Sequence, residues 1–162
     1  EDTILDDLLI PLESVRRGLR IVFREEAAAM EFERATPGLE FKRKVRTLAG
    51  NYQAFNRSGW AFNPFKSKIW LMLISHKVFR LMVPFALLLM FISSALHTGF
   101  LHPLFYCQLV FYVLAGAGWM ISRLGGKPIN FFSIPFTFVL LNAAAFRAFF
   151  TYYFKKNRLS WK

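Results

Sequence analysis

Two adjacent carboxylates, Asp6 and Asp7, begin the stretch of the sequence with the clearest chemical potential, "DDLLIPLESVRRGLRIVF". An aspartate directly before an apolar helix can cap that helix by accepting backbone N–H bonds, and negative charge is favourable at that end. A carboxylate at the mouth of a site can also act as a general base toward a hydroxyl within hydrogen-bond reach. The local pattern leaves both roles open, and the two roles are compatible.

The residues after the acidic pair predict one helix and one strand. Residues 8–17 fit a short helix, with Pro11 near its first turn and Gly18 just after its end. Residues 19–25, "LRIVFRE", have the β-branched and aromatic content of a strand. Helix, glycine and strand together predict that residues 1–38 are the C-terminal remnant of an α/β domain.

A second motif with chemical potential is "EFKRKVRTLAGNYQAF", which begins at Glu40. Its apolar residues recur at spacings of three and four and so line one face of a helix; they are Phe41, Val45, Leu48, Tyr52 and Phe55. Its cations mostly occupy the other side; they are Lys42, Arg43, Lys44 and Arg46. This pattern favours an amphipathic helix lying on a membrane surface, with a core-packed helix of a soluble domain as the alternative. We therefore predict an interfacial region over residues 39–80.

The second half of the chain is typical of a membrane protein. Three apolar runs without any acidic residue predict transmembrane helices at 81–97, 104–121 and 129–150, within a membrane region over residues 81–154. The positions of Lys and Arg beside these runs place the N-terminal part on the cytoplasmic side of a cell (inner or plasma) membrane. Three crossings would put the basic tail, residues 155–162, on the other side, against its charge, so the side of the tail stays open. The expected fold is mainly α-helical and multi-pass.

The charge of the chain is strongly asymmetric. The first 40 residues hold all ten acidic side chains and five arginines, whereas residues 41–162 hold sixteen Lys and Arg side chains. Because these cations border apolar runs, we expect membrane lipids, and not nucleic acid, as their partner. The single cysteine, Cys107, is expected to be a packing residue. The chain starts at Glu1 in the middle of a pattern, so we expect it to be the C-terminal piece of a longer protein.

Three stretches together resemble the C-terminal part of membrane-bound family 2 glycosyltransferases, which include hyaluronan, chitin, cellulose and poly-N-acetylglucosamine synthases. They are "DDLLIPLESVRRGLRIVF", "EFKRKVRTLAGNYQAF" and "SHKVFR", and the likeness covers nearly the whole chain. The resemblance implies inverting transfer of a sugar from a nucleotide-sugar donor to a growing polysaccharide or lipid-linked acceptor. It also implies that the donor pocket lies upstream, so that this chain alone is inactive.

The resemblance assigns roles residue by residue. Ten residues separate Asp7 from Gly18, which matches the position of the family's general base, and Asp6 takes the supporting acidic position. The stretch "RKVRT" stands where the family has QxxRW, and there only Arg46 agrees, which implies a contact with the donor diphosphate. Arg43 holds the Gln position, and Thr47 replaces the Trp on which acceptors stack. A divalent metal, Mg or Mn, is implied for the full-length enzyme, with ligands outside this chain.

Two readings from other classes remain. A non-catalytic membrane scaffold or accessory subunit would use the same basic helices and spans, with the acidic pair acting only as a helix cap. A small transporter would need polar or broken helices at the membrane midplane, for which only Asn142, expected to face the helix bundle, is suggestive. His76 in "SHKVFR" is expected to have a structural or lipid-headgroup role.

Overall fold

The structure is a computed structural model, and it describes residues 5–22, 24, 36–96, 102–126 and 128–154. Every regular element among these residues is helical. The helices are α1 (Asp6–Arg16), α2 (Pro37–Arg57), the continuous set α3 (Trp70–Leu73), π-helical segment (Ile74–Val78) and α4 (Phe79–Leu96), then α5 (His102–Arg123) and α6 (Asn130–Phe154). A 3₁₀ turn, Gly59–Phe62, follows α2. The prediction of a mainly α-helical chain is confirmed.

Helix α1 begins at Asp6, so neither aspartate occupies the N-cap position. That position belongs to Leu5, whose side chain cannot cap, and both aspartates lie in the first turn. The predicted cap is therefore wrong, although negative charge in the first turn still favours the helix through its dipole. Pro11 lies inside α1, where it removes one intrahelical hydrogen bond.

Gly18 ends α1 as the sequence predicts. Its φ of 75° lies in the left-handed region, which glycine adopts without a Cβ penalty. Its N–H donates to the carbonyl of Val15, and the next N–H, of Leu19, donates back to Ser14. These two bonds satisfy carbonyls that the last turn of a helix leaves open.

The strand expected at residues 19–25 does not form in the part of it that is described. Residues 19–22 and 24 have no regular secondary structure, whereas residues 23 and 25 lie outside the described residues. A strand is stable only when its backbone groups pair with another strand, and every other described element is a helix. Hydrophobic β-branched composition alone therefore misled the prediction at this point.

Helix α2 is longer than predicted, and its apolar face packs on α6. Thr36 provides the N-cap, with its hydroxyl accepting the N–H of Leu39, and Pro37 is the first helical residue. The predicted apolar stripe lies in one cluster together with residues of α6 and α4. On the α6 side three alanines, Ala144, Ala145 and Ala148, are at most 3% exposed. Small side chains let the two helix backbones approach closely, so α2 is seated on a helix and not only on a lipid surface.

Three helices are long and apolar enough to cross a membrane: Trp70–Leu96, Pro103–Arg123 and Asn130–Phe154. The second and third agree with the predicted spans to within a few residues. The first begins at Trp70 instead of residue 81, because the segment before Phe79 continues into α4 without a break. Its 27 residues exceed the roughly 20 that a bilayer core requires.

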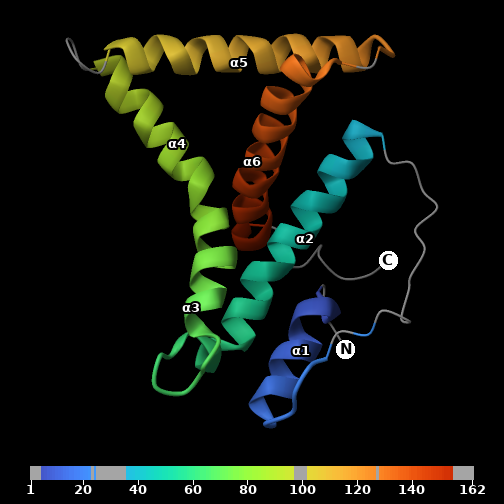
Figure 1. The fold of residues 1–162 in the computed structure, drawn as a ribbon, viewed down its shortest axis with the longest axis vertical. Helices are drawn as coiled ribbons and strands as arrows, with labels where there is room; N and C mark the ends of the chain where they lie inside the picture. Colours follow the sequence, from blue (N-terminus) through green and yellow to red (C-terminus); the bar gives the residue numbers. More distant parts are fainter. Residues whose placement is uncertain (1–4, 23, 25–35, 97–101, 127, 155–162) are drawn as a thin grey trace.

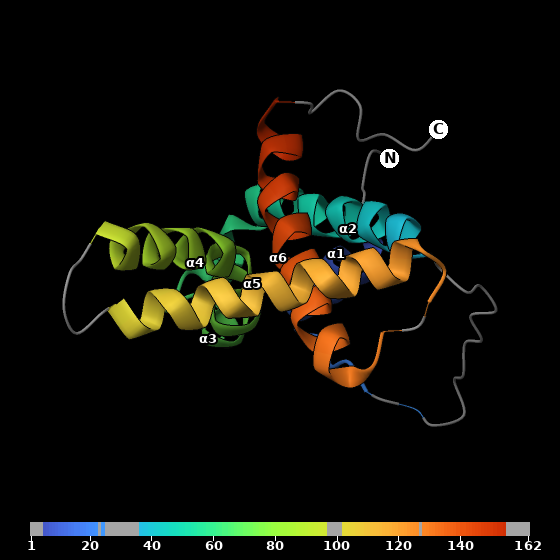
Figure 2. The ribbon, with the colours of Figure 1, turned by 90° about the horizontal axis from the view of Figure 1, so that it is seen from above.

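These three helices do not form a parallel bundle. Helix α5 lies across α4 and α6 in Figure 1, and seen from above it again crosses α6 (Figure 2). At the crossing, a Cβ placed on Gly118 would lie 2.5 Å from the carbonyl oxygen of Phe132. The absence of a side chain at this glycine is what lets α5 and α6 touch.

A second glycine-ended turn leads from α5 toward α6. Gly125 has a φ of 82°, and its N–H donates to the Ser122 carbonyl, while Gly126 donates to Ile121. This is the same two-bond ending that Gly18 gives α1. The connection expected at "SRLGGKP" is thereby confirmed at its described residues.

Candidate functional site

The acidic pair lies on an exposed turn of α1, and α1 itself is anchored beside the first membrane helix. Leu12 on α1 is 4% exposed and packs with Ala61 of the 3₁₀ turn and Leu73 of α3. Burial of one such leucine contributes roughly 1.5–3 kcal/mol. The contact places α1 beside the start of the first membrane-length helix; Figure 1 shows α1 near the end of the molecule where α3 begins.

The basic pair lies on the side of α2 that faces away from its apolar contact. Arg43 and Arg46 are both exposed, and their spacing of three residues puts them on one face of the helix. Val45 and Leu48, between and after them, are buried. The amphipathic pattern predicted for this helix is confirmed, with both arginine side chains on its exposed face.

Helices α1 and α2 contact each other, so the predicted acid and the predicted cation lie on neighbouring elements. The structure brings the two helices together, but the roles of Asp6, Asp7, Arg43 and Arg46 stay predictions. None of these four residues lines either of the membrane cavities described below. Within the described residues, no group of three His, Cys, Asp or Glu side chains gathers to hold a metal ion.

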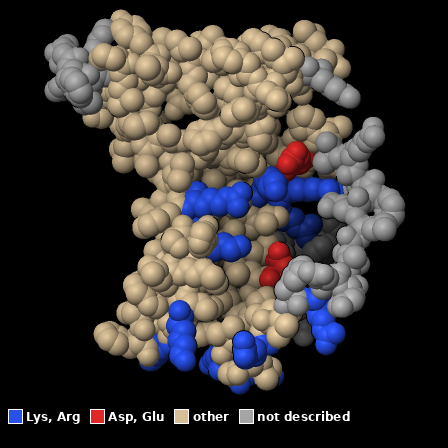
Figure 3. Space-filling model, viewed as in Figure 1, with Lys and Arg blue, Asp and Glu red and all other residues tan. Residues whose placement is uncertain are grey.

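Positive charge is concentrated in one zone of the surface. Figure 3 shows Lys and Arg side chains in a band across the middle of the face, with further cations toward the end where α1 and α3 lie. The upper part of this face, over α5, carries neither sign of charge. Helices α4, α5 and α6 each contain one charged residue; these are Arg80, Arg123 and Arg147. A charge-free apolar zone bordered by cations is the arrangement expected at a membrane surface.

Two features near this band were not foreseen from the sequence. The "SHKVFR" stretch contains a π-helical segment, Ile74–Val78, in which His76 is exposed. Such segments are rare and occur often at functional sites. No residue type in this segment predicts the π-helical turn, because that turn depends on the packing of the helix on either side of the segment.

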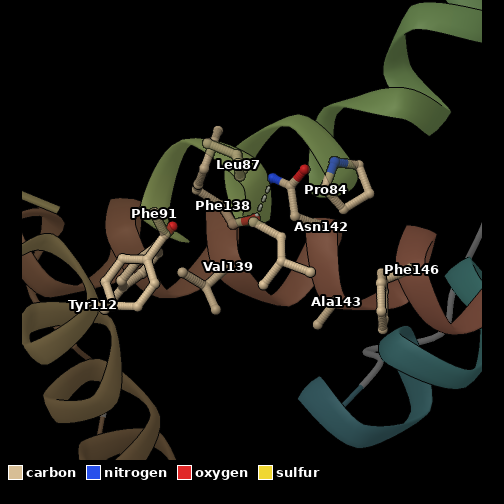
Figure 4. Close-up of a pocket in the computed structure, with 10 residues that line it drawn as sticks. Pro84, Leu87, Phe91, Tyr112, Phe138, Val139, Asn142, Ala143 and Phe146 are labelled. Carbon is tan, nitrogen blue, oxygen red and sulfur yellow. Dashed lines mark hydrogen bonds between the residues drawn. The ribbon is translucent and has the colours of Figure 1, made fainter. Parts of the chain in front are cut away.

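The second unforeseen feature is a cavity of about 270 Å³ between α4, α5 and α6, shown in Figure 4. Its lining is almost wholly apolar; it includes Pro84, Leu87, Phe91, Phe138 and Phe146. Asn142 is its main polar group, and the side-chain Nδ2 donates to the Phe138 carbonyl at 2.9 Å. The prediction that Asn142 faces the helix bundle is confirmed.

An aromatic contact joins α2 to the end of α6. The ring of Tyr52 stacks on that of Tyr152, with centroids 5.7 Å apart. Burial raises the pKa of the Tyr52 phenol above its ordinary value of 10.0, and the electrostatic effect of the neighbouring Tyr153 raises it further. The phenol therefore stays neutral at any physiological pH and serves packing.

No family model, no curated protein and no solved structure matches this chain.

Proposed function

We propose that the chain is the membrane-anchoring C-terminal part of an inverting glycosyltransferase. The full-length enzyme would move a sugar from a nucleotide-sugar donor to a polysaccharide or lipid-linked acceptor on the cytoplasmic side of the membrane. One observation carries the proposal beyond the sequence resemblance. The helix that begins with Asp6 and Asp7 contacts the helix that exposes Arg43 and Arg46. The first packs on Leu73 and the second on Leu81, both in the first membrane-length helix.

The proposed chemistry uses one group from each helix. An acceptor hydroxyl attacks the anomeric carbon of the donor, and the carboxylate of Asp7 takes the hydroxyl proton. The bond from that carbon to the diphosphate breaks, and its electron pair leaves with the diphosphate. The guanidinium of Arg46 binds the phosphate oxygens through paired N–H groups and stabilises the negative charge that develops there. Attack from the face opposite to the leaving group inverts the configuration of the sugar.

The arrangement of the helices favours this division of roles. Asp7 is in the first turn of α1, which stands on an apolar contact with the membrane-entry segment. Arg46 is on a helix held by α6 through Ala145 and Ala148. Both helices are thus packed against membrane-length helices, which supports a reaction on a membrane-bound acceptor.

The experiment is a sugar-transfer assay on the full-length protein in membranes, with a panel of radiolabelled nucleotide sugars. We expect transfer by the wild type, and a loss of about 10²–10³-fold in the Arg46→Ala variant. Lys42→Ala, which removes a neighbouring exposed cation of the same helix, is the matched control and should change transfer less than about threefold. Equal losses in both variants would assign Arg46 to lipid headgroups instead. No transfer with any donor would favour a non-catalytic scaffold.

A further inference from the structure

The apolar cavity between α4 and α6 adjoins a second cavity that is lined by a basic side chain. The second cavity, of about 210 Å³, shares Phe138 and Asn142 with the first and is also lined by Arg80. Arg80 lies one turn before Pro84 on α4. From Arg80 to Phe91, at the far end of the apolar cavity, the helix rises about 16 Å. The two cavities therefore adjoin at Phe138 and Asn142, with the Arg80 guanidinium beside one and aromatic rings lining the other.

The chemistry along the two cavities is graded. The larger cavity exposes far more apolar than polar surface, and its polar amide, on Asn142, uses one N–H within its own helix. An amide nitrogen has two N–H groups, so the other can donate to an ester carbonyl. Arg80 is exposed beside the smaller cavity. A ligand with an anion, a short polar linkage and a hydrocarbon chain in this order could contact Arg80, Asn142 and the apolar lining in turn.

We propose that the two cavities together bind one anionic phospholipid, with the phosphate at Arg80 and one acyl chain in the cavity between α4 and α6. The walls of the cavity come from helices long enough to span a membrane, and hydrocarbon chains are the apolar ligand present at that depth. This binding does not depend on the proposed sugar transfer, because it uses none of the residues assigned to it.

Charge favours an anionic lipid over the other occupants. Every formal charge on the described residues from 41 onward is positive, and no ion pair joins Arg80 to a described carboxylate. A zwitterionic headgroup would bring a second cation toward this surface. A second copy of the chain would bring its own basic band against the first, which is unfavourable.

Native mass spectrometry of the full chain in detergent micelles tests the proposal. The probes are dioleoyl phosphatidylglycerol, which is anionic, and dioleoyl phosphatidylcholine, which has the same chains and a zwitterionic headgroup. We expect the wild type to bind phosphatidylglycerol at least about tenfold more tightly, because both headgroups offer a phosphate to Arg80 but only phosphatidylcholine brings a quaternary ammonium beside that guanidinium. Arg80→Gln should abolish this preference. Lys68→Gln removes an exposed cation outside the cavity and should reduce affinity about fivefold at most, the effect of one surface charge.

A second pair of variants tests the acyl-chain cavity without any change of charge. Ala143 lines the cavity, so Ala143→Phe should fill it and weaken binding of both lipids. Ala86, an exposed alanine on α4 outside that lining, provides the control Ala86→Phe, which should bind like the wild type. Far-UV circular dichroism of each variant should match that of the wild type, as expected for substitutions at exposed positions.

Four results would overturn the proposal. The first is an equal loss of phosphatidylglycerol binding in Arg80→Gln and Lys68→Gln. The second is full lipid binding by Ala143→Phe. The third is displacement of the lipid by glycerol phosphate alone, since a headgroup without a chain does not use the cavity. The fourth is a wild-type dimer that Ala143→Phe dissociates, which would assign the cavity to a second copy of the chain.

Discussion

The contact between α5 and α6 depends on a single missing side chain, and replacing Gly118 tests it. A Cβ at this position would lie 2.5 Å from the Phe132 carbonyl oxygen, 2.9 Å from the Cβ of Phe136 and 3.2 Å from the Phe132 carbonyl carbon. Two of these atoms belong to the backbone of α6, which cannot move aside as the end of a flexible side chain can. Gly118→Ala must therefore push the two helices apart.

The magnitude follows from two opposing effects. Inserting a methyl group into a tightly packed contact costs about 1–3 kcal/mol. Replacing a helical glycine by alanine gains roughly 0.5–1 kcal/mol through helix propensity. Gly116→Ala supplies the second effect alone, because nothing lies within 4 Å of the added Cβ on the same helix. The difference between the two variants removes the shared propensity gain, so Gly118→Ala should be less stable than Gly116→Ala by about 1–3 kcal/mol.

The assay is reversible unfolding in mixed detergent micelles, with the free energy of unfolding compared among the wild type and the two variants. A Gly118→Ala protein as stable as the Gly116→Ala protein would refute the reasoning, because it would mean that α5 and α6 do not touch at this crossing. A loss of stability in both variants would likewise contradict it, since the structure has open space at Gly116.

Two further predictions concern stability. Because burial, and then Tyr153, raise the pKa of Tyr52, this phenol stays protonated in the folded chain at pH values where it ionises in the unfolded chain. Its contribution to the free energy of unfolding is therefore complete below pH 10.0 and is lost as the pH rises from that value through the raised pKa. The unfolding free energy of Tyr52→Phe should accordingly fall less steeply in this range, and parallel pH profiles would contradict the assignment. In the contact between α4 and α5, the Ser94 hydroxyl donates to the Gln108 side-chain oxygen at 3.1 Å, and the amide nitrogen of Gln108, Nε2, has no partner among the described residues. Ser94→Ala should cost about 0.6–1.7 kcal/mol in micelles, whereas Gln108→Leu should cost less, since it also removes the unpaired donor; a larger loss in Gln108→Leu would show that this amide bonds elsewhere.

The sequence predicted best where the hydrophobic pattern was long. The spacing of Phe41, Val45 and Leu48 predicts the buried face of α2 correctly, and the left-handed ends at Gly18 and Gly125 follow from glycine in positions that other residues disfavour. These signals are local, so one sequence is enough to read them.

The failures have non-local causes. Residues 19–22 have strand composition, but strand formation depends on a partner that none of the described elements provides. The partner of α2 could not be predicted from its apolar residues either, because the same apolar face can pack against lipid or against the alanines of α6. The three apolar runs predict three long helices but not their crossing, which combines the close approach at Gly118 with contacts such as that between the rings of Phe111 and Phe138.

The candidate site was predictable only in part. A resemblance in the sequence predicts Asp7 and Arg46 as site residues, and the structure adds only that their helices touch. The sequence could not indicate that Arg80 lines a cavity, because that cavity forms only where α6 lies against α4, with Asn142 between them. Contacts between helices far apart in the chain leave no signature in either helix alone.

The central claim is that Asp7 is the base of a sugar-transfer reaction, and the most direct measurement is the turnover of the full-length Asp7→Asn enzyme. Asparagine has nearly the same size but cannot accept the proton, so turnover should fall about 10²–10⁴-fold while expression and membrane insertion are retained. Glu13→Gln, a control carboxylate on the same helix that pairs with Arg17 at 3.0 Å, should keep turnover near that of the wild type. Near-normal sugar transfer by Asp7→Asn would contradict the account.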